Sequence, residues 1–221
     1  MGDNLGSIDV NNTFTPTSTS TNTPTITNTP TITSTPTITK TVTKSKTVTR
    51  SKTRTATPAG GVKEVVSIAT GDGYACAILA NDTVKCWGGN LVGQLGYGDT
   101  LNRGDGADEM GSNLPAVDLG SGRTAKVISA GPGAHACAIL DNNTVKCWGL
   151  NYAGQLGLGD TENRGDGADE MGSNLPAVDL GSGRTAKAIS VGKLHTCAIL
   201  DDGSVKCWGM NDYGQLGLDD S

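Results

Sequence analysis

The sequence has few aromatic residues and no long apolar run. Its 221 residues include a single Phe, and aromatic residues make up 4% of the chain, which excludes one large aromatic-rich core. No apolar stretch approaches the roughly 18 residues that a membrane-spanning helix needs. The chain contains 32 glycines instead, a combination typical of short strands joined by tight turns. We therefore expect an all-β protein without a membrane span.

Acidic residues are missing from one segment of the chain. Residues 11–58 contain six basic residues and no acid, whereas the rest carries 11 basic residues against all 22 acidic ones. The net charge of −5 lacks the basic excess of a nucleic-acid-binding protein. The division of charge would instead let the basic segment lie along acidic surfaces of other copies, an attraction that salt weakens.

No motif of enzymatic chemistry is present. The sequence has no phosphate-binding loop, no dinucleotide-binding glycine pattern and no catalytic-triad motif. The two histidines, His135 and His195, each stand two residues before a cysteine, and neither has a nucleophile or an acid at a motif spacing. We therefore predict a protein that is not an enzyme and has no cofactor.

Two acidic loops raise the question of calcium. Residues 99–109 and 160–170 are rich in carboxylates, which are ligands that calcium prefers. Their spacing does not match the EF-hand pattern. Solvated loops are the preferred interpretation, and a calcium site is the alternative.

The six cysteines form three pairs with the same spacing. In the segment CAILANDTVKC, antiparallel pairing centred on Asn81 places Cys76 opposite Cys86 and Ile78 opposite Val84, within disulfide reach. Buried free thiols are one alternative. Zinc is another, but structural zinc sites usually contain closer cysteine pairs. Disulfides persist outside the cytosol, so they predict an extracellular or cell-surface protein. The predicted bonds join Cys76 to Cys86, Cys137 to Cys147 and Cys197 to Cys207.

An internal repeat organises residues 61–221. The segment 102–126 returns unchanged at 163–187, and the landmarks CAIL, VKCWG and GQLG occur three times. A period of about 60 residues indicates propeller blades or a solenoid. Each unit predicts four short strands, in the order NLPAVDL, AKVIS, HACAIL and TVKCWG. The last two form a hairpin, whose loop places Asp82, Asn143 or Gly203 at a left-handed position.

These landmarks resemble a known repeat. The sequences at 73–79, 134–140 and 194–200, each followed by VKCWG and GQLG, resemble the regulator-of-chromosome-condensation repeat. The resemblance covers residues 62–221 and implies a β-propeller of four-stranded blades, commonly seven. The paired cysteines resemble the secreted branch of the family. We do not infer the nucleotide-exchange activity of the family's nuclear member for this chain. Only three units are present, and the disulfides and the acidic charge balance fit a nuclear protein poorly.

The segment 11–60 has its own composition. Every odd position between 13 and 57 is Thr or Ser. A disordered linker is one interpretation. We favour an extended, O-glycosylated rod, because Thr is β-branched and residues before Pro avoid the α region. The candidate O-glycosylation sites are Thr15, Thr17, Thr19, Thr21, Thr23, Thr25, Thr27, Thr29, Thr31, Thr33, Thr35, Thr37, Thr39, Thr41, Thr43, Thr47 and Thr49.

Three further triplets fit N-glycosylation. They begin at Asn11, Asn81 and Asn142, and the last two stand in the predicted hairpin loops. A bulky sugar is accommodated at such a loop. An Asn-rich loop also produces these triplets without carrying a sugar.

The first ten residues predict an orphan blade strand. MGDNLGSIDV matches MGSNLPAVDL at 110–119 and 171–180, so Met1 aligns with internal methionines. This match predicts a window from a longer repeat protein or from a repeating array. Since the 11–60 segment offers almost no glycine for a tight reversal, we expect residues 1–10 to complete a blade in another subunit by strand addition.

These features together predict a structural protein. The leading hypothesis is a subunit of an extracellular, glycosylated filament or cell-surface fibre, whose partners are copies of itself and which carries covalent glycans. The alternative is a secreted β-propeller recognition module, an adhesin or an inhibitor, on a glycosylated stalk.

Overall fold

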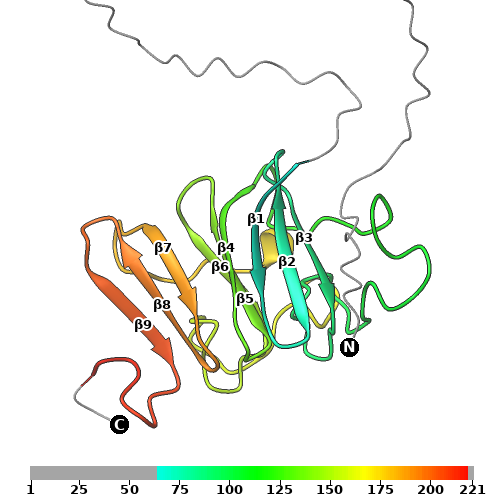
Figure 1. Cartoon of the computed structure of the whole chain (residues 1–221). Coiled ribbons are helices and arrows are strands. Elements are labelled where there is room, and N and C mark those ends of the chain that lie inside the picture. The colour runs from blue at the N-terminus through cyan, green and yellow to red at the C-terminus, as the bar shows by residue number, and fades with distance from the viewer. Residues whose placement is uncertain (1–63, 219–221) are drawn as a thin grey trace, which may run out of the picture. The chain divides into compact units, whose positions relative to one another are not determined.

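The computed structural model describes residues 64–218, which form three similar antiparallel sheets (Figure 1). Each sheet has three strands, arranged in space in their sequence order. We call the sheets blade 1 (β1–β3), blade 2 (β4–β6) and blade 3 (β7–β9). The elements are β1 (Val65–Thr70), β2 (Tyr74–Leu79), β3 (Val84–Gly88), β4 (Ala125–Ala130), β5 (His135–Leu140), β6 (Val145–Gly149), the 3-10 turn η1 (Gly172–Asn174), β7 (Ala186–Val191), β8 (His195–Leu200) and β9 (Val205–Gly209).

Several predictions concern other parts of the chain. The orphan strand 1–10 and the Thr/Pro-rich segment 11–60 lie outside the described residues. The same holds for Asn11 and for every candidate O-glycosylation site. Among residues 64–218, no helix is long and apolar enough to cross a bilayer.

The hairpin of each blade has the predicted register. Cys76 faces Cys86 and Ile78 faces Val84 across β2 and β3, and the other two blades repeat this pairing. The loop of each hairpin contains one residue with a left-handed backbone, a conformation that Gly, Asn and Asp tolerate best. These residues are Asp82 (φ 63°), Asn143 (φ 65°) and Gly203 (φ 87°), which confirms the predicted turn.

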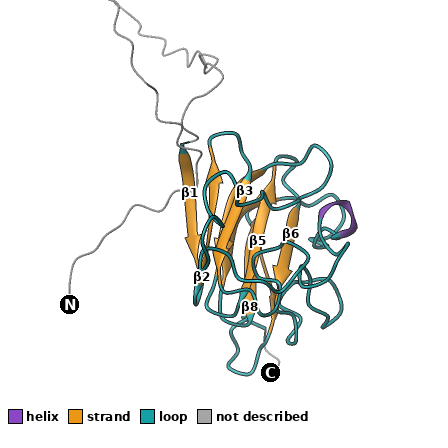
Figure 2. Ribbon diagram, turned by 90° about the vertical axis from the view of Figure 1, so that its right-hand side faces the viewer, coloured by secondary structure: helices purple, strands orange, loops and turns teal. Residues whose placement is uncertain are grey.

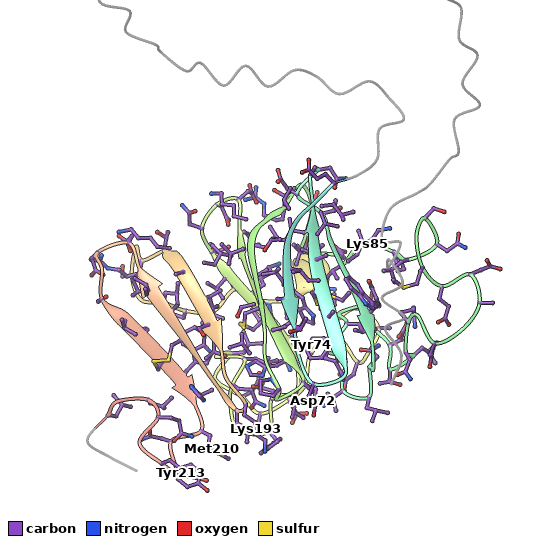
Figure 3. The ribbon with its side chains drawn as sticks, in the orientation of Figure 1. Asp72, Tyr74, Lys85, Lys193, Met210 and Tyr213 are labelled. Carbon is purple, nitrogen blue, oxygen red and sulfur yellow. A yellow bond between two sulfur atoms is a disulfide. The ribbon has the colours of Figure 1, made fainter. Side chains whose placement is uncertain are left out.

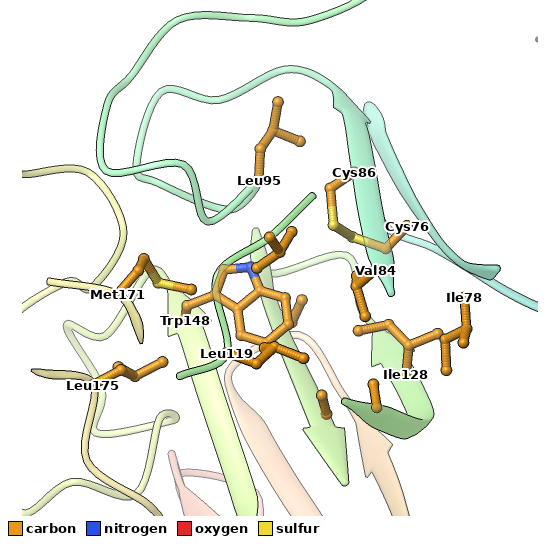
Figure 4. Packing of buried hydrophobic residues seen from close by; sticks show 14 of the residues in the cluster. Cys76, Ile78, Val84, Cys86, Leu95, Leu119, Ile128, Trp148, Met171 and Leu175 are labelled. Carbon is orange, nitrogen blue, oxygen red and sulfur yellow. A yellow bond between two sulfur atoms is a disulfide. The ribbon is translucent and has the colours of Figure 1, made fainter. Parts of the chain in front are cut away.

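Both faces of a blade are apolar, and neighbouring blades cover each other. In blade 2, Ala138 and Leu140 belong to the core shared with blade 1. On the opposite face, Cys137, Ile139 and Val145 belong to the core shared with blade 3. Strand alternation produces this division, because successive side chains point to opposite faces. Figure 2 shows the sheets standing face to face, and Figure 4 shows the packing around the buried indole of Trp148.

The prediction of a fourth strand per unit needs correction. The NLPAVDL segments, 113–119 and 174–180, are extended but do not form strands of the sheets. Each makes a single hydrogen bond to the neighbouring hairpin edge, from the N–H of Val117 to the carbonyl of Val84 (2.8 Å) and at the equivalent pair in blade 2. A proline within each segment has no N–H, so a regular ladder cannot form there.

Three disulfides cross-link the hairpins within their blades. They join Cys76 to Cys86, Cys137 to Cys147 and Cys197 to Cys207, the pairing that the spacing predicts. Each closes a short loop, which stabilises the folded chain by roughly 2–3 kcal/mol in the chain-entropy model. Such a contribution matters in blades that contain few large aromatic side chains.

We expect removal of the blade 2 disulfide to destabilise the protein. The double substitution C137A/C147A should cost about 2–5 kcal/mol of unfolding free energy, measured by urea denaturation. The matched control is C197A/C207A, which opens a loop of the same length at half-buried cysteines and should cost less. An unchanged urea midpoint for C137A/C147A would contradict this role of the bond.

Candidate functional site

The outer edges of blades 1 and 2 are covered by two matching segments. We call residues 110–119 and 171–180 the outer segments, because each lies along the last strand of its blade. Three apolar side chains of each segment are only 1–8% exposed. They therefore complete the core of the blade without joining its sheet. The buried apolar residues are Leu114, Val117 and Leu119 in the first segment and Leu175, Val178 and Leu180 in the second.

A buried lysine holds the start of each outer segment. The ammonium of Lys85 on β3 donates to the carbonyl of Gly111 at 2.6 Å (Figure 3). On β6, the ammonium of Lys146 donates to the carbonyls of Gly172 (2.7 Å) and Leu119 (3.0 Å). Burial lowers the pKa of Lys146, and the nearby Asp118 carboxylate opposes this shift. These carbonyls accept hydrogen bonds from the lysine ammonium groups, whose charge would otherwise be costly to bury.

Gly172, at the start of the second outer segment, has no room for a side chain. Gly172 has φ +65° and donates its N–H to the carbonyl of Asp118 at 3.0 Å. A Cβ atom at Gly172 would lie 2.4 Å from the Asp118 carboxylate. Gly111 has the same backbone conformation. The outer segment therefore requires glycine in its second position.

Blade 3 has no outer segment among the described residues. Val205 on β9 is 63% exposed, whereas its counterparts Val84 and Val145 are fully buried. Lys206 is exposed, although the equivalent lysines of the other blades are 7–8% exposed. Figure 1 shows β9 as the last strand at one end of the row of blades. The open β9 edge is thus a copy of an edge that is covered twice elsewhere.

The first ten residues have the composition that this edge needs. Met1 and Gly2 align with the Met-Gly that begins each outer segment. Leu5, Ile8 and Val10 align with the three buried apolar positions of each outer segment. Asp3, Gly6 and Ser7 differ from the Ser, Pro and Ala of the outer segments. Sequence reasoning found this match but missed the lysine clamp.

His135 occupies a structural position at the joints of blade 2 with its neighbours. His135 is fully buried, and its Nε2 lies 3.0 Å from the hydroxyl of Thr196 in blade 3. That hydroxyl donates to the carbonyl of Gln155. Tyr74, which replaces histidine in blade 1, donates its hydroxyl to the carbonyl of His135 at 2.5 Å. Blade 3 has His195 at this position, half-buried.

Acidification should destabilise the protein through His135. Burial lowers the pKa of this imidazole to about 4, below its value near 6.5 in an unfolded chain. The unfolded state therefore binds more protons between these values, and stability should fall by about 2–3 kcal/mol as the pH drops from 7 to 4. Urea denaturation across this range should show a smaller loss in H135Q. The same pH dependence in H135Q and wild type would contradict this origin.

Several carboxylates of the acidic loops form ion pairs or hydrogen bonds within the same loop. Asp99 pairs with Arg103 at 2.7 Å, and Asp160 pairs with Arg164 in blade 2. The carboxylate of Glu109 accepts hydrogen bonds from three successive backbone N–H groups of its own loop. Residues 64–218 contain no cluster of three or more side chains that would hold a metal ion. The calcium alternative therefore has no group of ligands in this part of the chain.

A polar groove of about 670 Å³ lies between the outer ends of blades 1 and 2. Tyr97 and Arg103 line one side, with the guanidinium 5.4 Å from the centre of the ring. Asp118 and Asp169 also line it. The Tyr97 hydroxyl donates to the carbonyl of Cys86, and burial raises the pKa of this phenol. The groove is a second candidate site, suited to a polar ligand.

Two sequons fall on exposed hairpin loops. Asn81 and Asn142 are solvent-exposed, in the β2–β3 and β5–β6 loops. Each side-chain oxygen accepts a hydrogen bond of 2.8 Å from the threonine hydroxyl of its own triplet. Whether they carry a sugar remains a prediction.

These antiparallel blades, packed face to face, define a β-propeller repeat protein. Models of the regulator of chromosome condensation (RCC1) repeat match residues 65–94, 126–155 and 186–215, and a second model of the same description matches 143–199. The chain therefore belongs to the RCC1 repeat family, as its repeated landmarks predicted.

Relatives of known identity share these repeats. The ultraviolet-B receptor UVR8 of Arabidopsis thaliana is 32% identical over 159 residues, which are 71% of this chain and 32% of the receptor. Protein pim1 of Schizosaccharomyces pombe is 32% identical over 170 residues, which are 76% of this chain and 29% of that protein. The chain thus spans about a third of the length of these relatives. Human WBSCR16 has the same fold, with a TM-score of 0.54 and 21% identity over 75% of this chain and 45% of its own.

Proposed function

We propose that this chain is a structural subunit of an extracellular, glycosylated filament or cell-surface fibre. Residues 1–10 of one copy complete blade 3 of another, and the Thr-rich segment connects the two. The observation that carries this proposal is the open β9 edge, whose counterparts in blades 1 and 2 are covered by segments that residues 1–10 match. The proposal assigns the protein no enzymatic role.

The covered edges suggest how the added segment binds. The N–H of Ile8 would donate to the carbonyl of Val205, as Val117 does to Val84. The ammonium of Lys206 would donate to the carbonyl of Gly2, as Lys85 does to Gly111. An exposed strand edge that receives a segment of another chain is a recurrent mode of assembly. Contacts between different surfaces of identical subunits form open filaments when their rotation does not close.

Three features support the extracellular and glycosylated part of the proposal. Cross-linking of all six cysteines suits an oxidising compartment. The sequons at Asn81 and Asn142 are exposed on loops that accommodate a sugar. The composition of residues 11–60, dense in Thr beside Pro, is that of O-glycosylated stalks.

The peptide MGDNLGSIDV should block assembly. In excess, it would occupy the β9 edge and prevent addition of residues 1–10 from another copy, which shortens the fibres seen by electron microscopy. The matched control is the same peptide with Gly2→Val, because a side chain at this position would meet the carboxylate of Asp179, as Asp118 stands beside Gly172. Fibres of normal length with the unchanged peptide would contradict strand addition.

The groove beside Tyr97 favours a second candidate function, a secreted recognition module on a glycosylated stalk. Its polar lining offers a cationic group and carboxylates to a partner. One relative, UVR8, is an ultraviolet-B receptor. The two functions differ in native material, since a recognition module gives dispersed particles under the electron microscope and a structural subunit gives periodic fibres.

A further inference from the structure

Residues 64–218 contain four Asp-Gly pairs, a dipeptide that can rearrange chemically. The pairs begin at Asp72, Asp105, Asp166 and Asp202. In such a pair the backbone nitrogen of the glycine can attack the carboxyl carbon of the aspartate, because glycine has no Cβ to shield that nitrogen or to restrict the rotation that the attack requires. The reaction depends on both groups being free to move, so the contacts of each pair decide its rate.

The pairs in the two acidic loops are held at both groups. The carboxylate of Asp105 accepts a hydrogen bond from the side-chain amide of Asn102 at 3.0 Å. The N–H of Gly106, whose nitrogen would have to attack, donates to the carboxylate of Glu109 at 2.9 Å. The pair at 166–167 repeats both hydrogen bonds with the equivalent residues of its own loop.

The pair in the blade 3 hairpin is also held at both groups. The carboxylate of Asp202 accepts hydrogen bonds from the N–H (2.9 Å) and the hydroxyl (2.6 Å) of Ser204. It also pairs with the guanidinium of Arg184 at 3.0 Å. The N–H of Gly203 donates to the carbonyl of Leu200 at 3.0 Å.

The remaining pair lacks these restraints. Asp72 and Gly73 are exposed on the turn that joins β1 to β2, where Figure 3 shows Asp72 near Tyr74. Among residues 64–218, no group donates a hydrogen bond to the Asp72 carboxylate and none accepts one from the Gly73 N–H. No atom lies within 4 Å of a Cβ built at Gly73, so the turn is open on this side.

We infer that Asp72 is a site of spontaneous isomerisation to isoaspartate, and that it reacts faster than the three restrained pairs. The nitrogen of Gly73 forms a bond to Cγ of Asp72, and one carboxylate oxygen leaves as water with the amide proton and a proton from solvent. Water then adds to the main-chain carbonyl carbon of the cyclic imide, the bond from that carbon to the nitrogen breaks, and the nitrogen regains a proton. The composition is unchanged, and water is the only co-reactant. The reaction occurs within one chain, so it does not depend on the proposed self-assembly.

The product would alter the joint between blades 1 and 2. Isoaspartate lengthens the main chain by one carbon atom just before Gly73 and Tyr74. The carbonyl of Gly73 accepts a hydrogen bond from the N–H of Gly89 at 2.8 Å, and the Tyr74 hydroxyl donates to the carbonyl of His135 in blade 2. Since a longer turn displaces both groups, the isomer separated by chromatography should unfold at a lower urea concentration than the unmodified chain. Equal urea midpoints would overturn this effect on the joint.

Ageing the full chain in water labelled with oxygen-18 tests the inference. After incubation at neutral pH, peptide mapping by mass spectrometry should find isoaspartate carrying one heavy oxygen atom at position 72. Because at least two hydrogen bonds must break before each other pair can react, the rates at those pairs should be lower by about tenfold or more. The matched control D72E keeps the charge but needs a larger ring, so no isomer should form at this position. Equal rates at Asp72 and Asp202 would overturn the inference.

Removal of a restraint tests its cause. E109A deprives the Gly106 N–H of its acceptor, so isomerisation at Asp105 should accelerate about twofold to tenfold, as expected for one hydrogen bond, while the rate at Asp72 stays unchanged. E170A is the matching change in the second acidic loop and decides the question if circular dichroism shows that E109A does not fold. An unchanged rate at the released pair would contradict the role given to these hydrogen bonds.

Discussion

Every blade of this protein depends on a neighbour to cover its Cys–Ile–Val face. Within residues 64–218 this requirement is met at two joints, where the Ala–Leu face and the tryptophan of the next blade close over it. Because apolar area removed from water is the main favourable contribution to folding, burial at these joints stabilises the blades in addition to the hydrogen bonds of the sheets. Ile199 on the corresponding face of blade 3 is 44% exposed, because no further blade follows it among the described residues.

The composition explains why each blade needs stabilising contacts beyond its apolar core. With one Phe and small residues on the Ala–Leu face, a hairpin has little apolar volume of its own. A disulfide cross-links the hairpin, and a buried lysine ties the outer segment through backbone carbonyls. Neither device uses a side chain of the outer segment, so a segment of different sequence fits if it keeps the glycine and the apolar spacing. Residues 1–10 keep both.

Local features of the fold could be predicted from the sequence, whereas features between segments could not. The pairing of Cys76 with Cys86 and the left-handed residue of each hairpin loop follow from spacing and turn chemistry, and both were predicted correctly. The prediction of a strand over each NLPAVDL segment is wrong, because Pro115 and its counterpart Pro176 lack the N–H that a ladder needs. The lysine clamp and the joint of Trp148 on Gly96 connect residues about 25 to 50 positions apart, and no local pattern encodes such contacts.

The central claim is that this chain completes its blades with other copies of itself. The most direct test is the melting temperature of the full chain measured as a function of protein concentration, with the mass of the species followed by sedimentation. Completion by other copies predicts a melting temperature that rises with concentration, because association stabilises only the folded state. A constant melting temperature with a monomer mass at every concentration would contradict the account.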